Sequence, residues 1–575
     1  MKKIILIFCL LVLFCQRSYS QNVGIGTVTP AARLHIKGSA DTSQLVIDAA
    51  ATQLNIHPLL RFRNSSGSDL LWMHTDDTSN IFIGINAGRV NDAPNFAKDN
   101  IFIGLNAGQG NTEGSANIGL GSHALHSNVS GTYNTGIGWH SLYFNTTGYN
   151  NTALGEALEF NTTGFNNTAS GHGALYKNTS AESNTANGAF TLYNNTTGNY
   201  NTAAGAAALY SNTNGFSNVA VGVDAMRLNT AGDKNTAIGV HALYSAANGQ
   251  ENTVVGYDAL LYGNCAYNTA VGAKTLYANE GGSYNTAIGH SSMTHNTTGY
   301  QNTAVGDSSL FYNTTGQLNT ALGYHALHGN FSGSYHTVVG ANALPAGNSS
   351  QYCTAVGYGA LAYTTSGIQN TAVGANALAT VTTGMNNTGI GVGAGVSAGD
   401  ITMGTALGAF AQVNASNKVR VGSTSVVTIE GQVGFSVVSD GRFKENIRED
   451  IKGLDFIMEL QPVSYNFNRL RYAQHLKQEL TPEMKTTLTD QSFERTIGFI
   501  AQDVEKAILQ TGFTSFDAVH KPTNETDNYS IRYADFVVPL VKAVQQQQQI
   551  IEALTKRLEK LEAEFLRPVV LKRYY

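Results

Sequence analysis

Residues 302–318, with the sequence NTAVGDSSLFYNTTGQL, form one unit of a repeat that fills most of this 575-residue chain. The unit reads N-T-A-[VIL]-G-x-x-A-L-[YF]-x-N-T-T-G-x-x, and the step between units is 17 residues almost throughout, with two steps of 16. So regular a period is typical of a structure in which each unit makes one turn and stacks on the next. The first position of the unit recurs about 19 times, at Asn100, Asn117, Asn134, Asn151, Asn167, Asn184, Asn201, Asn218, Asn235, Asn252, Asn268, Asn285, Asn302, Asn319, His336, Cys353, Asn370, Asn387 and Gly404.

The length of the unit restricts the fold. Helical repeats need about 33 residues or more, and leucine-rich repeats need about 20–29 with a different consensus. Within the unit, T-A-V-G and x-A-L-Y are short apolar runs separated by glycine and by the N-T-T-G turn. We therefore expect two short strands and two turns per coil, stacked in parallel. The predicted fold class is mainly β, a parallel β-roll or β-solenoid.

The small residues of the unit indicate a narrow coil. Inward Ala and Gly fit such a coil, and the asparagine at the first position is expected to form a hydrogen-bonded ladder from coil to coil. A thin coil buries little apolar area, which favours association of several chains side by side. The pattern resembles the head repeats of trimeric autotransporter adhesins, and that resemblance implies a trimer.

The sequence before the repeats predicts export. Residues 1–20 combine Lys2 and Lys3, an apolar run from Ile4 to Cys15 and a small-x-small site at Ser18–Ser20, as a secretory signal peptide does. Residues 21–79 alternate short apolar and polar runs and are interpreted as an N-terminal β cap. The repeats are assigned to residues 80–411 and a β connector, with strands at 418–422 and 426–430, to residues 412–438.

The charge and the cysteines of the chain argue against a nucleic-acid partner and against a metal site. Only 13% of residues are charged, and removing the three basic residues of the leader changes the net charge from -5 to -8, so no basic surface indicates a nucleic-acid partner. After the leader, Cys265 and Cys353 remain, and neither has the spacing of a metal site. We expect two unpaired thiols, no metal, no cofactor and no transmembrane segment once the leader is removed.

The last quarter of the chain begins at residues 439–447, SDGRFKENI, where charge density rises sharply and marks a domain boundary. Near its end, residues 540–566 carry an apolar seam with alternating steps of 4 and 3, which predicts a coiled coil between copies of the chain. An amphipathic helix folded on its own domain is the alternative. The seam is Leu540, Val544, Gln547, Ile551, Leu554, Leu558, Leu561 and Phe565.

Several motifs in this quarter resemble, in the same order, those of the peptidase S74 domain, the intramolecular chaperone of phage endosialidase tail spikes. They are SDGRFKENI at 439–447, LQPVSY at 460–465, IGFIAQDVE at 497–505 and IRY at 531–533. The resemblance implies a chaperone domain over residues 439–575 that drives trimer assembly. It also implies that Ser439 is a nucleophile and Lys444 its base, and that the chain is cut between Ser439 and Asp440.

The chemistry of a Ser-Lys pair is consistent with that implication. A serine hydroxyl needs a base to become nucleophilic, and a desolvated lysine is able to serve as that base. Attack of Ser439 on its own carbonyl would need a four-membered ring, so attack on the Val438 carbonyl or on a neighbouring subunit stays open. The alternative is that Ser439 caps the following helix and Lys444 is a solvated charge.

The combined prediction is an exported trimeric fibre or adhesin-like surface protein, secreted or held at the bacterial cell surface. Its proteolysis would be directed only at itself, and its outward partners would be cell-surface glycans or receptors. One rival is a glycan-processing tail-spike enzyme, although the repeats lack paired carboxylates of glycosidase type. Another is a structural fibre that retains an inactive chaperone.

Overall fold

The computed structural model describes residues 23–25, 34–36, 45, 47–48, 57–91 and 96–566. The signal peptide expected at residues 1–20 lies outside the described residues, as does much of the expected β cap. The chain divides into two compact units, Met1–Glu182 and Ser183–Tyr575, which are described separately.

The first unit begins with irregular pairing and then becomes a parallel ladder. β1 (Val23–Ile25) pairs in parallel with β2 (Leu34–Ile36), whereas β3 (Leu60–Arg63), β4 (Asp69–His74) and β5 (Ile81–Ile83) pair antiparallel in sequence order. From β5 onward every neighbouring pair is parallel and in register, which is the solenoid arrangement. Its further strands are β6 (Ile101–Ile103), β7 (Ile118–Leu120), β8 (Thr135–Ile137), β9 (Thr152–Leu154) and β10 (Thr168–Ser170).

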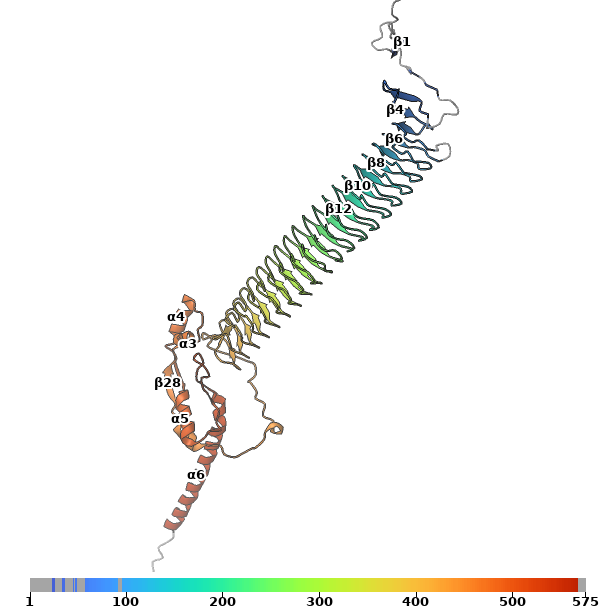
Figure 1. Ribbon diagram of the computed structural model, residues 1–575. Helices are drawn as coiled ribbons and strands as arrows, with labels where there is room; N and C mark the ends of the chain where they lie inside the picture. The colour runs from blue at the N-terminus through green and yellow to red at the C-terminus, as the bar shows by residue number, and fades with distance from the viewer. Residues whose placement is uncertain are drawn as a thin grey trace, which may run out of the picture. The chain divides into compact units, whose positions relative to one another are not determined.

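The second unit continues the same construction with one three-residue strand per repeat (Figure 1). In β18, for example, Ala304 is buried while Thr303 and Val305 point outward, and Ala304 pairs in register with Ala321 of β19. This is the alternation that a pleated strand imposes on T-A-V. The strands are β11 (Thr185–Asn187), β12 (Thr202–Ala204), β13 (Val219–Val221), β14 (Thr236–Ile238), β15 (Thr253–Val255), β16 (Thr269–Val271), β17 (Thr286–Ile288), β18 (Thr303–Val305), β19 (Thr320–Leu322), β20 (Thr337–Val339), β21 (Thr354–Val356), β22 (Thr371–Val373), β23 (Thr388–Ile390), β25 (Thr405–Leu407) and β27 (Val419–Val421).

The second strand expected in each coil, over x-A-L-Y, does not form along most of the solenoid. The leucine of this segment is buried with a left-handed backbone, as at Leu310 with φ 51°, so the segment turns instead of extending. Its N–H groups still reach the next coil, because Leu310 N–H donates to the Ala326 carbonyl at 2.9 Å. Among the described residues, short strands pair here at the end of the solenoid alone, β24 (Gly395–Val396) with β26 (Gln412–Val413).

Two buried asparagine ladders run through the solenoid, where the sequence analysis expected one. In the first ladder, at the first repeat position, Asn302 Oδ1 accepts the backbone N–H of Asn319, and Asn302 Nδ2 donates to the Gly316 carbonyl at 2.9 Å. In the second ladder, formed by the asparagine of N-T-T-G, Asn296 Nδ2 donates to Asn279 Oδ1 at 2.6 Å. Each ladder therefore satisfies buried polar groups and fixes the register between coils.

The two glycines of the consensus unit lie where successive coils approach closely, and a few units carry another residue at the second position, as at Ala181 and Ser350. A Cβ on Gly306, whose φ is 132°, would lie 2.5 Å from the Gly323 carbonyl oxygen. A Cβ on Gly316 would lie 2.4 Å from both Asn313 Oδ1 and the Gly333 carbonyl oxygen. Cys265 and Cys353 are buried and free in the single chain.

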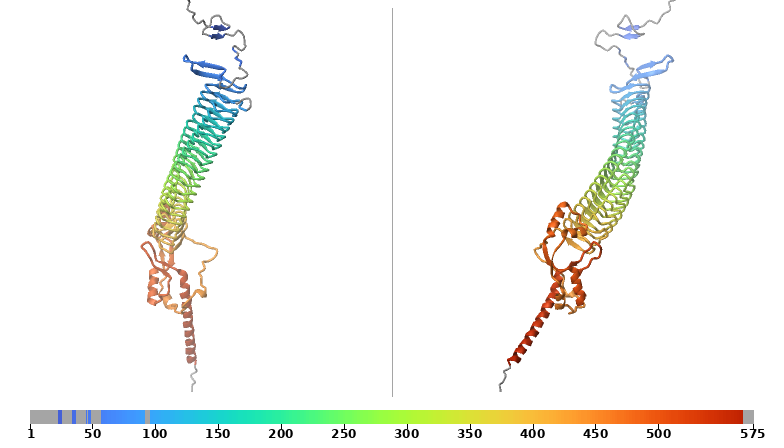
Figure 2. Two further views of the ribbon diagram at one scale, coloured as in Figure 1. Left: turned by 45° about the vertical axis from the view of Figure 1, so that its right-hand side comes forward. Right: turned by 90° about the vertical axis from the view of Figure 1, so that its left-hand side faces the viewer.

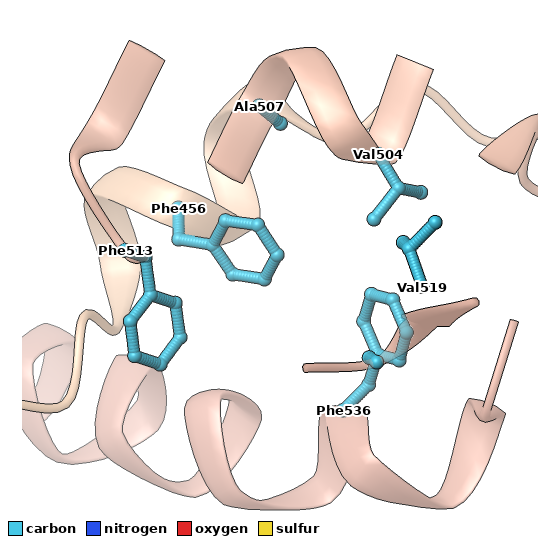
Figure 3. Close-up of a cluster of buried hydrophobic side chains, with 7 residues drawn as sticks. Phe456, Val504, Ala507, Phe513, Val519 and Phe536 are labelled. Atoms are coloured by element: carbon cyan, nitrogen blue, oxygen red, sulfur yellow. The ribbon is translucent and has the colours of Figure 1, made fainter. Parts of the chain in front are cut away.

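The residues after the solenoid form a small domain of helices and short antiparallel sheets around an aromatic core (Figure 3). The ring of Phe456 contacts those of Phe513 and Phe516, with centroids 5.4 and 5.1 Å apart. The elements are η1 (Gly441–Phe443), α2 (Leu454–Glu459), β28 (Val463–Asn466), α3 (Arg469–His475), α4 (Pro482–Gln491), β29 (Arg495–Gly498), α5 (Ala501–Thr511), β30 (Val519–His520), β31 (Ser530–Ile531), η2 (Tyr533–Phe536) and α6 (Val537–Phe565).

The long helix α6 is buried only at its start, where Pro539 and Ala543 pack on the domain, and its C-terminal half projects away from the other helices (Figure 2). The connector between solenoid and domain also differs from expectation. A strand forms at Val419–Val421, but the strand expected over residues 426–430 does not form, and residues 427–439 are exposed. A single chain offers this connector no neighbouring strand with which to pair.

Candidate functional site

The serine and lysine singled out by sequence meet at the end of the exposed connector. Lys444 Nζ donates a hydrogen bond to Ser439 Oγ at 2.7 Å. Both residues are exposed in the single chain. The structure thus brings together the two side chains that the resemblance pairs.

A single tight turn makes this contact possible. Asp440, and not Ser439, caps η1, because its Oδ1 accepts the backbone N–H of Arg442 at 2.9 Å. The backbone N–H of Lys444 donates to the Gly441 carbonyl at 3.2 Å, which closes the turn and returns the lysine towards Ser439. The alternative in which Ser439 caps the helix is therefore wrong.

The carboxylate beside Ser439 is held by its own neighbour. The Arg442 guanidinium binds both oxygens of Asp440, with Nε 2.9 Å from Oδ2. The hydrogen bonds from the Arg442 side chain and backbone lower the pKa of Asp440 below its usual value. Asp440 is consequently an anion engaged with Arg442, which leaves Lys444 to contact the serine.

Two polar residues of the motif at 497–505, Gln502 and Glu505, lie on α5, and Glu505 is paired with a lysine of the same domain. Glu505 forms an ion pair with Lys521, which follows β30, and that hydrogen bond lowers the pKa of Glu505. Gln502 is exposed on the same helix. Asp527, a buried carboxylate that binds Lys418 at the end of the solenoid, has no signal in the sequence because it lies in an ordinary polar loop with no motif.

Among the described residues, no group of three or more His, Cys, Asp or Glu side chains is arranged to hold a metal ion. No helix within the described ranges is long and apolar enough to cross a membrane.

These features define a class of protein: a parallel β-solenoid joined by an exposed connector to a small domain that ends in a projecting helix. Residues 439–513 match the model of the family described as chaperone of endosialidase, Peptidase S74, and the match begins at Ser439. A search of curated proteins found no match to this chain. The solenoid and the chaperone domain together fit a tail-fibre or adhesin-like protein.

Proposed function

We propose that this chain is an exported, trimeric fibre or adhesin-like surface protein whose C-terminal domain, residues 439–575, assembles the trimer and then cuts the chain at Ser439. The observation that carries this proposal is the 2.7 Å contact between Lys444 Nζ and Ser439 Oγ. It lies at the first residues of the family match and in the exposed connector between the two structural parts.

The apolar seam of α6 supports assembly of several chains. In the single chain the seam residue Leu554 is 58% exposed, and Ile551, Leu558 and Leu561 are also exposed. An unpaired seam of this kind is stabilised when helices from other copies cover it. The connector adds exposed apolar side chains at Val433, Phe435 and Val437. Both surfaces have the composition of contacts between copies rather than of a free surface.

Assembly also provides what the Ser-Lys chemistry needs. A lysine acts as a base only when it is neutral, and desolvation favours the neutral form. Because Ser439 and Lys444 are exposed in one chain, neighbouring copies would have to exclude water from the pair. The cut would then follow assembly, so the domain would remain covalently attached while the solenoids associate.

The reaction can be written with Ser439 Oγ as the nucleophile. Neutral Lys444 takes the hydroxyl proton while Oγ attacks a peptide carbonyl, the amide nitrogen leaves with the proton, and water hydrolyses the resulting ester. Attack on the Val438 carbonyl gives an N-to-O shift within one chain, and attack on a neighbouring copy is the second route. Each route leaves a C-terminal fragment that begins at or next to Ser439.

The trimer is tested by light scattering on the uncut Ser439→Ala variant. We expect the mass of three chains for Ser439→Ala, and the mass of one chain when Leu554→Asp is added, because a carboxylate in the seam opposes pairing. Gln549→Asp, on the opposite face of α6, is the matched control and should remain trimeric. A monomeric Ser439→Ala protein, or a trimer that tolerates Leu554→Asp, would contradict assembly through this seam.

A further inference from the structure

The loop between β30 and β31 is anchored on the end of the solenoid by a buried carboxylate. The side chain of Asp527 has no exposed surface, and its Oδ1 lies 3.1 Å from Nζ of Lys418, next to β27. Its Oδ2 lies 2.7 Å from His520 Nε2 and accepts the backbone N–H of Thr523 at 3.0 Å. A carboxylate buried this fully is held only where such partners surround it.

Amide side chains extend the contact on both sides of Asp527. Asn414 Nδ2 donates to the Thr526 carbonyl at 3.0 Å and to Asn528 Oδ1 at 2.7 Å. In return, Asn524 Nδ2 donates to the Asn414 carbonyl at 3.0 Å. Ser397 Oγ and Thr526 Oγ1 are 2.9 Å apart. The loop between β30 and β31 therefore forms hydrogen bonds with both the backbone and the side chains of the last coils.

A second group of contacts lies between the solenoid end and the α3 region. Arg420 donates to Tyr472 Oη at 3.1 Å, and its guanidinium lies 5.5 Å from the centre of that ring. Arg469 donates to the Thr424 carbonyl at 3.1 Å, and Thr424 Oγ1 donates to Gln478 Oε1 at 2.9 Å. Apart from the bonds of Asp527 to His520 and Thr523, these bonds join residues 397–424 to residues 469–528, on opposite sides of Ser439.

The charges at the centre favour a lasting contact. Burial alone raises the pKa of Asp527, but the hydrogen bonds from the Thr523 backbone, His520, the Asn528 backbone and Lys418 outweigh it and lower that pKa. His475 Nε2 also approaches the Asp527 carbonyl oxygen, at 3.1 Å. Breaking a buried ion pair by removing one partner is costly because the other charge stays buried.

We propose that residues 520–528 form a latch that binds the C-terminal domain to the last solenoid coils without a covalent link, so that the domain stays on the solenoid after the connector is cut. The latch, residues 520–528, binds the end of the solenoid around Asn414 and Lys418. None of the bonds described above involves residues 425–439, the exposed part of the connector in which the proposed cut is made. The latch stands whether the cut is made by the chain itself or by an added protease.

The test uses the full chain with Ser439→Ala, which blocks cutting by the proposed pair, and a protease recognition sequence in place of residues 430–436. After cutting, native size-exclusion chromatography at neutral pH separates bound from released domain, and a denaturing gel identifies the pieces. We expect the C-terminal fragment to co-elute with the solenoid. Separation of the two pieces without further mutation would overturn the latch.

Variants on both sides of the latch sharpen the test. Asp527→Asn and, on the solenoid, Lys418→Met each remove one partner, and each should weaken binding at least about a hundredfold. Glu505→Gln removes a carboxylate whose ion pair lies within the C-terminal domain, and its fragment should stay bound. Lys418→Met leaves the C-terminal fragment unchanged, so release in that variant does not reflect misfolding of the domain. Co-elution in both latch variants as in their parent would contradict the role of the pair.

Discussion

His336 takes the place of an asparagine in the first ladder: its Nδ1 accepts the backbone N–H of Cys353 at 3.2 Å, in the next coil. Its Nε2 lies 3.0 Å from the Ser350 carbonyl oxygen, and its backbone N–H donates to Asn319 Oδ1 at 3.0 Å. A ring that accepts at Nδ1 and donates at Nε2 is neutral. Burial lowers the pKa of His336 to about 4.

The solenoid should therefore lose stability in mild acid. The unfolded chain binds a proton at this histidine below pH about 6.5, whereas the folded chain does not until about pH 4, so stability is full above the unfolded pKa and falls between these values. The loss attributable to His336 is about 3 kcal/mol at most. Chemical unfolding at pH 7 and pH 5 measures the part of this loss that falls in that interval, about 2 kcal/mol. His336→Asn restores the amide of the ladder and should reduce the difference in unfolding free energy between the two pH values. An equal pH dependence in both proteins would show that His336 is not its cause.

The second ladder is interrupted at Ala246 and Gly263, and one substitution should extend it by one coil. Asn229 Oδ1 is buried without a hydrogen-bond partner in the described structure, because the next coil carries Ala246 where an asparagine is expected. Ala246→Asn supplies the missing Nδ2 donor and should stabilise the protein by about 1 kcal/mol at most, because the new Oδ1 faces Gly263 and no ladder amide in the following coil. The neighbouring Ala247→Asn, outside the ladder position, is the control. An unchanged or lowered unfolding midpoint for Ala246→Asn would show that the amide does not enter the ladder.

Adjacent glycines should respond in opposite ways to one added methyl group. A Cβ on Gly282 would lie 2.3 Å from both Asn279 Oδ1 and the Gly299 carbonyl oxygen, whereas a Cβ on Gly281 meets only Thr298 Cγ2 at 3.9 Å. We expect Gly282→Ala to lower stability by about 2 kcal/mol or more through forced separation of the coils. Gly281→Ala should be neutral or slightly stabilising. Equal unfolding midpoints for the two variants would contradict the close-approach account.

The sequence was sufficient to predict the stacked coils because the repeat encodes contacts that recur every 17 residues. The inward alanines and the first asparagine ladder follow from such periodic signals, whereas the pairing of Ser439 with Lys444 was implied by the resemblance to the S74 family. The prediction of a second strand in each coil was wrong, because the chain turns at the buried leucine, which has a left-handed backbone conformation. The pattern of polar and apolar side chains does not reveal this conformation, because it is imposed by the closure of the coil.

Contacts distant in sequence remained hidden for a different physical reason. Asp527 and Lys418 are separated by 109 residues and belong to no repeat, so neither spacing nor composition pairs them. The domain boundaries at 79, 411 and 438 stay predictions, as does the coiled coil over residues 540–566. The exposed seam of α6 is one side of the predicted coiled coil, and helices from other copies of the chain would have to supply the other sides.

The most direct test of the account is the intact mass, under denaturing conditions, of the protein expressed from Gln21 onward. Wild type is compared with Ser439→Ala and Lys444→Ala. Scaled from 61.0 kDa for 575 residues, the 136 residues from Asp440 to Tyr575 have a mass of roughly 14 kDa. We predict that fragment in wild type and an uncut chain in both variants. A single full-length mass in all three proteins, or the same fragment in all three, would contradict self-cleavage by the Ser439–Lys444 pair.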